Sequence, residues 1–300
     1  MAPVATLAVA LALLLDLVVA EPPVSIHPVA WFGRFVGRFD RPFAHPGVVG
    51  FLVAAALPVA AAAAVAIPVA LLEGVNPLLG GLAAGGVLFT TVSLRMLVTE
   101  GAKIVRLSDG ATDEAREAAL SLVGRDRASL SPAQIRSAAV ESVAENLADG
   151  LVGPLLAFAI AAQVSLPAAV GAAVWVKAVN TLDSMLGYPD KAVGTASARL
   201  DDLVAWAPAR LSALLIALAA VNPSALSSAR AWARSPGSPN SGWPMATAAA
   251  AADVQLEKPG EYVLNPEATL PTVESAGGAI RVVGIAGLLA FALAGVGTWV

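Results

Sequence analysis

The stretch AAVESVAENLADG, residues 138–150, gives the strongest single indication of how this chain folds and what it binds. Just upstream, Ser131 and Gln134 form the S-x-x-Q pattern of a helix capping box. Gly150 is a typical residue at the C-terminal end of a helix. The pattern therefore predicts one helix over about 132–149.

Three acidic residues of this helix share one face. Glu141, Glu145 and Asp149 are spaced i, i+4 and i+8, and like charges at that spacing repel one another. No lysine or arginine stands three or four positions from Glu145, so a local ion pair does not explain the acids. A divalent cation is the simplest ligand for such a stripe, and a solvated polar face is the alternative.

The composition indicates an integral membrane protein. Of 300 residues, 57% are hydrophobic and only 13% are charged, whereas soluble domains have about 25% charged residues. The net charge of −4 argues against nucleic acid as a partner. Because the chain has no cysteine and only two histidines, any metal must take oxygen ligands, which favours magnesium.

Four segments are long and apolar enough to be predicted membrane spans. Two further apolar segments are interrupted by polar residues and are either broken spans or re-entrant helices. We therefore predict an all-α, polytopic helical bundle, and we treat residues 1–300 as a single membrane-embedded domain. The predicted spans are 3–20, 47–72, 78–98 and 279–299, and the ambiguous segments are 151–176 and 203–222.

Two polar regions, 99–150 and 223–278, separate these segments, and the first is expected to contain a helix at about 112–123. The loop 21–46 alternates arginines with aromatic residues, which is typical of an interfacial amphipathic helix, although the arginines could instead bind an anionic substrate. If the N-terminus is outside, both 21–46 and 99–150 lie on the cytoplasmic side, and the positive-inside rule is satisfied.

Polar residues gather in four clusters, and ionisable groups beside membrane segments indicate function by default. For each cluster the alternative is a helix cap or an internal ion pair, such as Lys177 with Asp183. Arg210 has no acid nearby in sequence, so a phosphate is its expected partner. The clusters lie within 141–149, 177–188, 199–210 and 238–244.

No P-loop, G-x-S-x-G or H-E-x-x-H motif is present, so the residues alone indicate a membrane protein that binds metal and phosphate. Three classes stay open at this stage: an enzyme, a transporter with a charged intramembrane site, and a noncatalytic membrane scaffold.

Taken together, the motifs resemble one family, the adenosylcobinamide-phosphate synthases, which are membrane proteins of cobalamin biosynthesis of the CobD/CbiB type. The resemblance covers nearly the whole chain. Two departures are Glu21-Pro22, where the family usually has D-P, and the short linker 189–197. The motifs are HPV (27–29), GRD (124–126), AAVESVAENLADG (138–150), KAVNTLDSMLGY (177–188), ARLDDLVAWAPARL (198–211), PNSGWP (239–244), YVLNP (262–266) and LPTV (270–273).

The resemblance implies an amide-forming ligase that joins adenosylcobyric acid to aminopropanol phosphate or ethanolamine phosphate, with ATP as co-substrate and Mg²⁺ as cofactor. It further implies a multi-pass protein of the cell membrane whose active site faces the cytoplasm. The expected partners are the corrinoid, the aminoalcohol phosphate and membrane lipid. Homo-oligomers and contacts with other cobalamin-biosynthesis enzymes are left open.

Within the clusters we assign roles as hypotheses. The catalytic candidates are Glu141, Glu145, Asp183 and Lys177. The substrate-binding candidates are His27, Asn146, Asn180, Arg199, Arg210, Asn240 and Trp243. The metal-ligand candidates are Glu141, Glu145, Asp149, Asp201 and Asp202.

Overall fold

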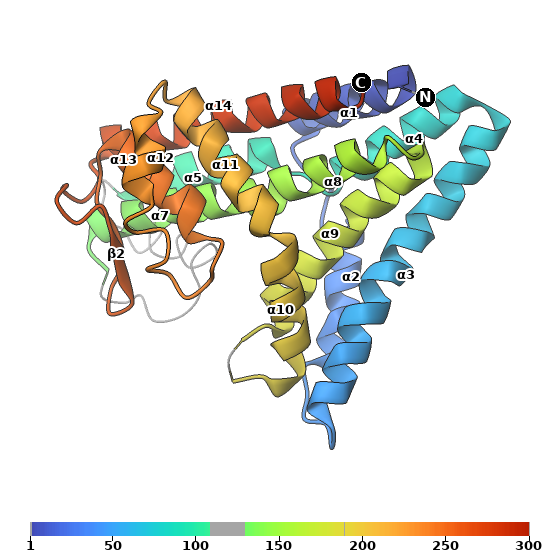
Figure 1. The fold of residues 1–300 in the computed structure, drawn as a ribbon, viewed down its shortest axis with the longest axis horizontal. Helices are drawn as coiled ribbons and strands as arrows, with labels where there is room; N and C mark the ends of the chain where they lie inside the picture. The colour runs from blue at the N-terminus through green and yellow to red at the C-terminus, as the bar shows by residue number, and fades with distance from the viewer. Residues whose placement is uncertain (1, 109–129, 189, 300) are drawn as a thin grey trace. The chain divides into compact units, whose positions relative to one another are not determined.

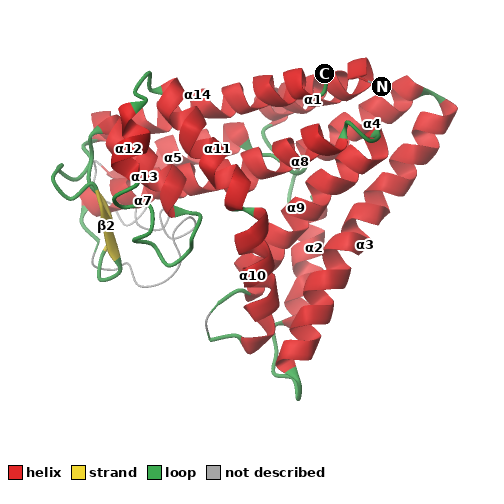
Figure 2. Cartoon of the chain, in the orientation of Figure 1, coloured by secondary structure: helices red, strands yellow, loops and turns green. Residues whose placement is uncertain are grey.

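The computed structural model describes residues 2–108, 130–188 and 190–299, and almost all of the regular structure in them is helical (Figure 2). The predicted helix at 112–123 and the GRD motif lie outside the described residues. The all-α fold expected from the sequence is confirmed, with one small exception. Strands β1 (Leu256–Lys258) and β2 (Tyr262–Leu264) form an antiparallel hairpin in which Glu257 pairs with Val263.

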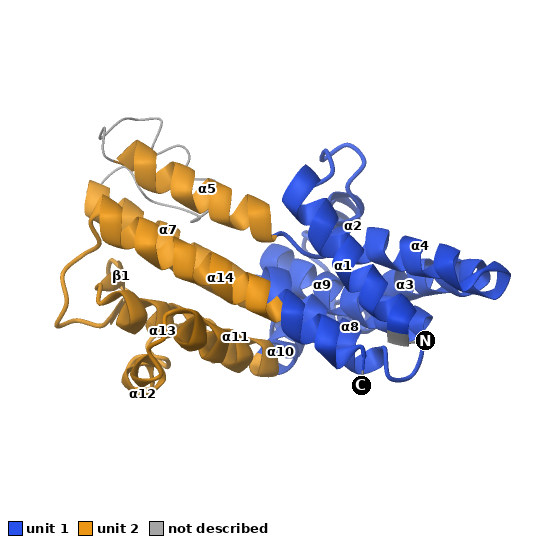
Figure 3. Cartoon of the chain, turned by 90° about the horizontal axis from the view of Figure 1, so that it is seen from above, with its two compact units in different colours: residues 1–93, 149–205, 291–300 blue, residues 94–148, 206–290 orange. Residues whose placement is uncertain are grey.

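The described chain forms two compact units, each assembled from separate stretches of sequence (Figure 3). Unit 1 comprises residues 1–93, 149–205 and 291–300, and unit 2 comprises 94–148 and 206–290. The single domain expected from the sequence stays a prediction.

Unit 1 is built around α9, which packs against α3, α8, α10 and α2 (Figure 1). A short 3₁₀ turn, Ala192–Gly194, leads into α10. The helices of this unit are α1 (Ala2–Val19), α2 (Pro28–Val36), η1 (Gly37–Phe39), α3 (Pro46–Val75), α4 (Pro77–Phe89), α8 (Gly153–Ala161), α9 (Leu166–Leu186) and α10 (Thr195–Val204).

In unit 2, α7 packs against α5, α13 and the β-hairpin, and α13 also packs against α11 and α12. The helix α14 begins in unit 2, and its last residues belong to unit 1. The helices are α5 (Leu94–Leu107), α7 (Pro132–Leu147), α11 (Trp206–Ala219), α12 (Ser224–Ala229), α13 (Gly242–Ala252) and α14 (Val273–Gly297).

Small residues allow α1 and α4 to approach closely. A Cβ atom added at Gly81 would lie 2.6 Å from a methyl of Val4, and one added at Gly85 would lie 2.9 Å from the carbonyl oxygen of Ala8. These two glycines are therefore required by the packing of the two helix backbones.

In the described residues, four helical runs are long and apolar enough to cross a membrane: 46–75, 77–107, 132–161 and 273–297. Three of them correspond to predicted spans, although the run 77–107 is interrupted at Thr90–Ser93, between α4 and α5. The predicted span at 3–20 is a shorter apolar helix, Pro3–Val19. The ambiguous segment 203–222 contains α11, which makes a fifth span if it is joined to the helix before it.

The run 132–161 corrects the expected end of the acidic helix. The capping box at Ser131 and Gln134 forms as predicted. Gly150 does not end the helix, however, because a π-helical turn, η3 (Ala148–Val152), carries the backbone into α8. The chain reverses only at Ala162–Ser165, where Ser165 caps α9. The segment 151–176 thus contains α8 and the first half of α9, and its assignment as a broken span or a re-entrant pair stays a prediction.

Candidate functional site

A polar cavity of about 240 Å³ lies in unit 1, lined by side chains from α9, from the segment before α2 and from the segment after α4. Lys177 reaches it from α9, and Glu21 and His27 reach it from the loop that follows α1. Thr90, Thr91 and Ser93 add hydroxyl groups. An acid, an imidazole and a cation therefore line one cavity.

His27 is held in a single tautomer. It is the N-cap of α2, and its Nδ1 accepts a hydrogen bond of 3.2 Å from the backbone N–H of Val29. The proton of the neutral ring must therefore lie on Nε2, which is 3.8 Å from Oε2 of Glu21. Burial, and then the positive charge of Lys177, lowers the pKa of His27 and favours the neutral form.

Glu21 is a carboxyl group with an increased proton affinity. Burial raises the pKa of Glu21, and the negative charge of Asp16 adds to this effect. Lys177 and a hydrogen bond from Ser93 oppose it without cancelling it. Asp16 is fully buried in α1.

The acids that act on Lys177 are Glu21 and Asp149. The expected partner, Asp183, lies six positions further along α9 and instead faces the charge of Asp202 on α10. The structure therefore brings together His27, Lys177 and Asp149, three of the sequence candidates. It groups Asp183 with Asp202 elsewhere in the same unit.

The remaining unit 1 candidates lie along α9 and α10. Asn180 accepts a hydrogen bond of 2.9 Å at its backbone carbonyl from Ser184. Arg199 is exposed on α10, and Asp201 is half-buried beside it in sequence. Their roles stay predictions.

Glu141 anchors the β-hairpin of unit 2 to α7. Its Oε1 accepts a hydrogen bond of 2.7 Å from Ser137, and its Oε2 accepts one of 2.6 Å from Tyr262 on β2. Ser137 in turn accepts a bond of 2.7 Å from the backbone N–H of Glu257 on β1. The charge of Glu145 also acts on Tyr262, so Glu141 and Glu145 both lie near the β-hairpin.

Asn146, on the same helix, donates to the backbone carbonyl of Ser142 at 2.9 Å and is exposed. Glu141 is 7% exposed, and each of its carboxylate oxygens already accepts a hydrogen bond from a hydroxyl group. A structural role accounts for the position of Glu141 without a metal. Its assignment as a catalytic residue and metal ligand stays a prediction.

Arg210 joins α11 to the PNSGWP loop. Its guanidinium lies over the rings of Trp206 and Trp243, at 4.9 and 5.3 Å from their centroids. It donates to the Trp206 carbonyl at 3.0 Å, to Oδ1 of Asn240, and to the Pro239 carbonyl at 3.3 Å. Two of its five N–H donors have no hydrogen-bond partner within the part of the chain that the structure describes, which leaves capacity for a phosphate.

The structure thus brings the substrate-binding candidates Arg210, Asn240 and Trp243 into one cluster, and this cluster belongs to unit 2. With these sites in place, comparison with known proteins identifies the chain. The family model for CobD/CbiB proteins matches residues 9–290. The chain belongs to the CobD/CbiB family.

Curated relatives of this CobD/CbiB chain agree with that assignment. The probable cobalamin biosynthesis protein CobD of Methanothrix thermoacetophila is 35% identical over 93% of this chain and 92% of its own length. The cobalamin biosynthesis proteins CobD of Klebsiella pneumoniae and CbiB of Salmonella choleraesuis are each 38% identical over 85% of this chain and 83% of their own lengths. No solved structure matches the chain.

Over residues 2–108, 130–188 and 190–299, no group of three or more histidine and acidic side chains is arranged to hold a metal ion. Mg²⁺ often binds through one or two carboxylates, because water and substrate phosphates complete its octahedron. A magnesium site of that kind does not need three protein side chains. The magnesium assignment of Glu141, Glu145, Asp149, Asp201 and Asp202 stays a prediction.

Two residues of the CobD/CbiB sites were missed at the level of sequence. Glu21 was noted only as a departure from the family pattern, yet it faces His27 and Lys177. Tyr262 stood in the YVLNP motif without a role, yet it binds Glu141. Each residue lies in a motif that the family shares, and this was the only indication in the sequence that it has a role. No helical or strand spacing connects either residue to its partner.

Proposed function

We propose that this CobD/CbiB chain is an adenosylcobinamide-phosphate synthase, a ligase that forms an amide between adenosylcobyric acid and an aminoalcohol phosphate with consumption of ATP. The observation that supports this most directly is the cavity that holds Lys177, Glu21 and His27. The cavity combines a cation, a carboxyl group with raised proton affinity and a neutral imidazole, which are the groups that such a reaction requires.

The size of this cavity favours the smaller substrate. At about 240 Å³ it lies below the range of about 300–1,000 Å³ typical of pockets for drug-sized ligands. A two- or three-carbon aminoalcohol phosphate is small enough to enter, whereas a corrin macrocycle is not. Lys177 is suited to bind its phosphate and Glu21 to face its ammonium group.

The proposed ligase reaction has two steps. A carboxylate oxygen of adenosylcobyric acid attacks the γ-phosphorus of ATP, which releases ADP and gives an acyl phosphate. The free amine of the aminoalcohol phosphate then attacks the acyl carbon, phosphate leaves, and the amide forms. Glu21 takes the proton that the ammonium must lose, and the Nε2–H of His27 stabilises the Glu21 carboxylate.

Bound Mg²⁺ would neutralise part of the phosphate charge during the first step. Asp149 near Lys177, and the pairs Glu141–Glu145 and Asp201–Asp202, are the carboxylates we propose to hold it. We also place the active site on the cytoplasmic side of the cell membrane, because both expected substrates and ATP are cytoplasmic.

Product formation by the purified protein tests this function. We expect the protein in detergent, supplied with adenosylcobyric acid, aminopropanol phosphate and Mg-ATP, to form the amide and release ADP, as followed by mass spectrometry. Glu21→Gln is expected to lower kcat by about 10²–10⁴-fold, the usual contribution of a general base. Lys177→Met is expected to abolish the reaction.

Two matched variants sharpen the test. Glu21→Asp restores the residue usual in the family and is expected to retain activity. Lys103→Met removes an exposed lysine that pairs with Glu100 on α5, and it is expected to behave as wild type. A transporter or a scaffold would yield no product, so an inactive wild-type protein refutes the proposed function.

A further inference from the structure

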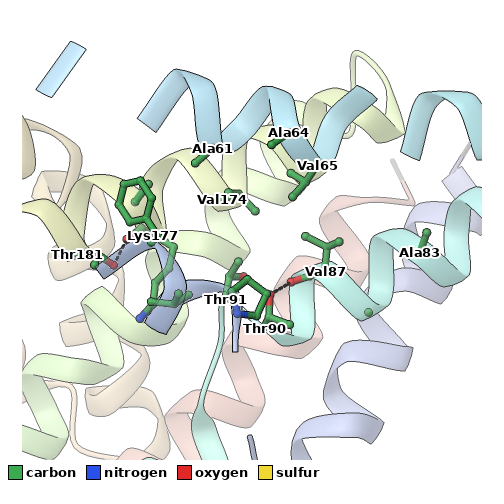
Figure 4. A pocket seen from close by; sticks show the side chains of 15 residues that line it. Ala61, Ala64, Val65, Ala83, Val87, Thr90, Thr91, Val174, Lys177 and Thr181 are labelled. Atoms are coloured by element: carbon green, nitrogen blue, oxygen red, sulfur yellow. Dashed lines mark hydrogen bonds between the residues drawn. The ribbon is translucent and has the colours of Figure 1, made fainter. Parts of the chain in front are cut away.

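A second cavity, of about 380 Å³, lies in unit 1 and has largely apolar walls, which include the ring of Phe32 (Figure 4). Three of the walls are each one face of a helix, because their lining residues recur at i, i+3 and i+4. The residues that form these faces are Ala61, Ala64 and Val65 on α3, Ala83, Gly86 and Val87 on α4, and Val174, Lys177 and Ala178 on α9.

The hydroxyl groups on these walls donate their protons within their own helical turns. Thr90 donates to the carbonyl of Val87 at 2.8 Å, and Thr181 donates to the carbonyl of Lys177 at 2.7 Å (Figure 4). Thr91 donates to the carbonyl of Leu88 at 2.7 Å. The cavity therefore offers a ligand apolar surface and no hydroxyl donor, which disfavours a nucleotide or a sugar.

Lys177 lines this cavity and the polar cavity alike. The acids that act on its ammonium group are Glu21, which lines the polar cavity, and Asp149. A lysine in this position keeps its methylene stem against apolar surface and its charge in polar surroundings. Val29, Thr90 and Thr91 also line both cavities, so the two cavities adjoin at Lys177.

We propose that one acyl chain of a membrane lipid occupies this apolar cavity and packs against the stem of Lys177. Two of its three main walls, α3 and α4, belong to helical runs with the length and composition of membrane spans. In a bilayer, such helices are surrounded by the hydrocarbon chains of lipids. An uncharged chain suits the site because the charge of Lys177 is already opposed by Glu21 and Asp149.

A larger side chain at Gly86 can fill this cavity. A Cβ atom added at Gly86 meets nothing within 4 Å, so Gly86→Leu places its side chain in the cavity without a backbone clash. Gly74 on α3 is equally open but does not line the cavity, so Gly74→Leu is the matched control. Ala64→Leu fills the cavity from α3 and serves as a second test variant.

The experiment uses phosphatidylcholine vesicles in which one acyl chain carries a diazirine near its end. After irradiation of the reconstituted full-length protein, adducts are mapped by peptide mass spectrometry. We expect adducts on the cavity-lining residues of α3, α4 and α9. Relative to adducts on Leu71, which is 69% exposed on α3, they should fall at least fivefold in Gly86→Leu and in Ala64→Leu and stay unchanged in Gly74→Leu.

Adducts confined to exposed side chains, or lining adducts unchanged in both filled variants, would overturn the proposal. Loss of the lining adducts on addition of adenosylcobyric acid would also overturn it, because the cavity would then belong to that substrate. The measurement needs no turnover, so its outcome is independent of the proposed ligase activity.

Discussion

Tyr262→Phe removes one hydroxyl from the network that holds the β-hairpin on α7. The hydroxyl donates to Oε2 of Glu141 at 2.6 Å, and this carboxylate is buried and has one other hydroxyl donor, Ser137. A hydrogen bond to a charged group contributes about 1.5–3 kcal/mol, so we expect the free energy of unfolding to fall by about 2 kcal/mol.

Denaturant titration in mixed micelles measures this loss, and hydrogen exchange of residues 256–264 locates it. The chain has only two tyrosines, and the other one, Tyr188, is exposed beneath Lys191. Tyr188→Phe is therefore a matched control, with an expected change below about 0.5 kcal/mol for a surface substitution. In a double-variant cycle, Tyr262→Phe and Glu141→Gln should be coupled by about 0.5–3 kcal/mol.

The network also predicts a pH dependence. Burial, and then the charge of Glu141, raises the pKa of Tyr262 above its ordinary value of 10.0. The unfolded chain therefore loses this proton first, and stability falls as the pH rises past about 10. Tyr262→Phe should lack this component. An unfolding free energy within about 0.5 kcal/mol of wild type in Tyr262→Phe would show that the contact contributes nothing and refute the reasoning.

Three further predictions concern the other sites. His27→Ala should cost about 1 kcal/mol through loss of the α2 cap, whereas His27→Asn should keep the cap. Because folding lowers the pKa of His27 from 6.5, stability should fall as the pH drops below about 6.5 in wild type, and this component should be absent in His27→Asn. Glu145→Gln should weaken the magnesium dependence of activity in a folded protein, and an unchanged magnesium titration would remove Glu145 from the metal site. Arg210→Lys loses the planar fork and should raise the KM for one phosphorylated substrate by about ten- to a hundredfold, with the exposed Arg230→Lys as control, and unchanged kinetics in Arg210→Lys and Arg210→Ala would make Arg210 structural.

Features that depend on neighbours in sequence could be predicted. The predicted capping box at Ser131 and Gln134 and the predicted membrane helices at 47–72 and 279–299 were correct. Hydrogen bonds within one helical turn and the hydropathy of a segment follow from adjacent residues, so sequence alone contains the required information.

Gly150 shows where local information fails. Glycine commonly ends helices, yet here the backbone continues through a π-helical turn into α8, and the residues on both sides of the turn are buried. Packing on neighbouring helices, rather than intrinsic propensity, supplies most of the stability of a helix. Tertiary structure therefore decided that the acidic helix belongs to a run long enough to cross a membrane.

The sites needed tertiary structure for a related reason. The sequence by itself determined that Lys177, Glu141 and Arg210 are costly polar groups beside apolar segments. Their partners, such as Glu21 for Lys177 and Tyr262 for Glu141, come from distant elements and share no helical spacing with them. Only the packing of α9 against α2 and of the β-hairpin against α7 brings these groups within reach, because a hydrogen bond or ion pair forms over a few ångströms of space and not along the chain.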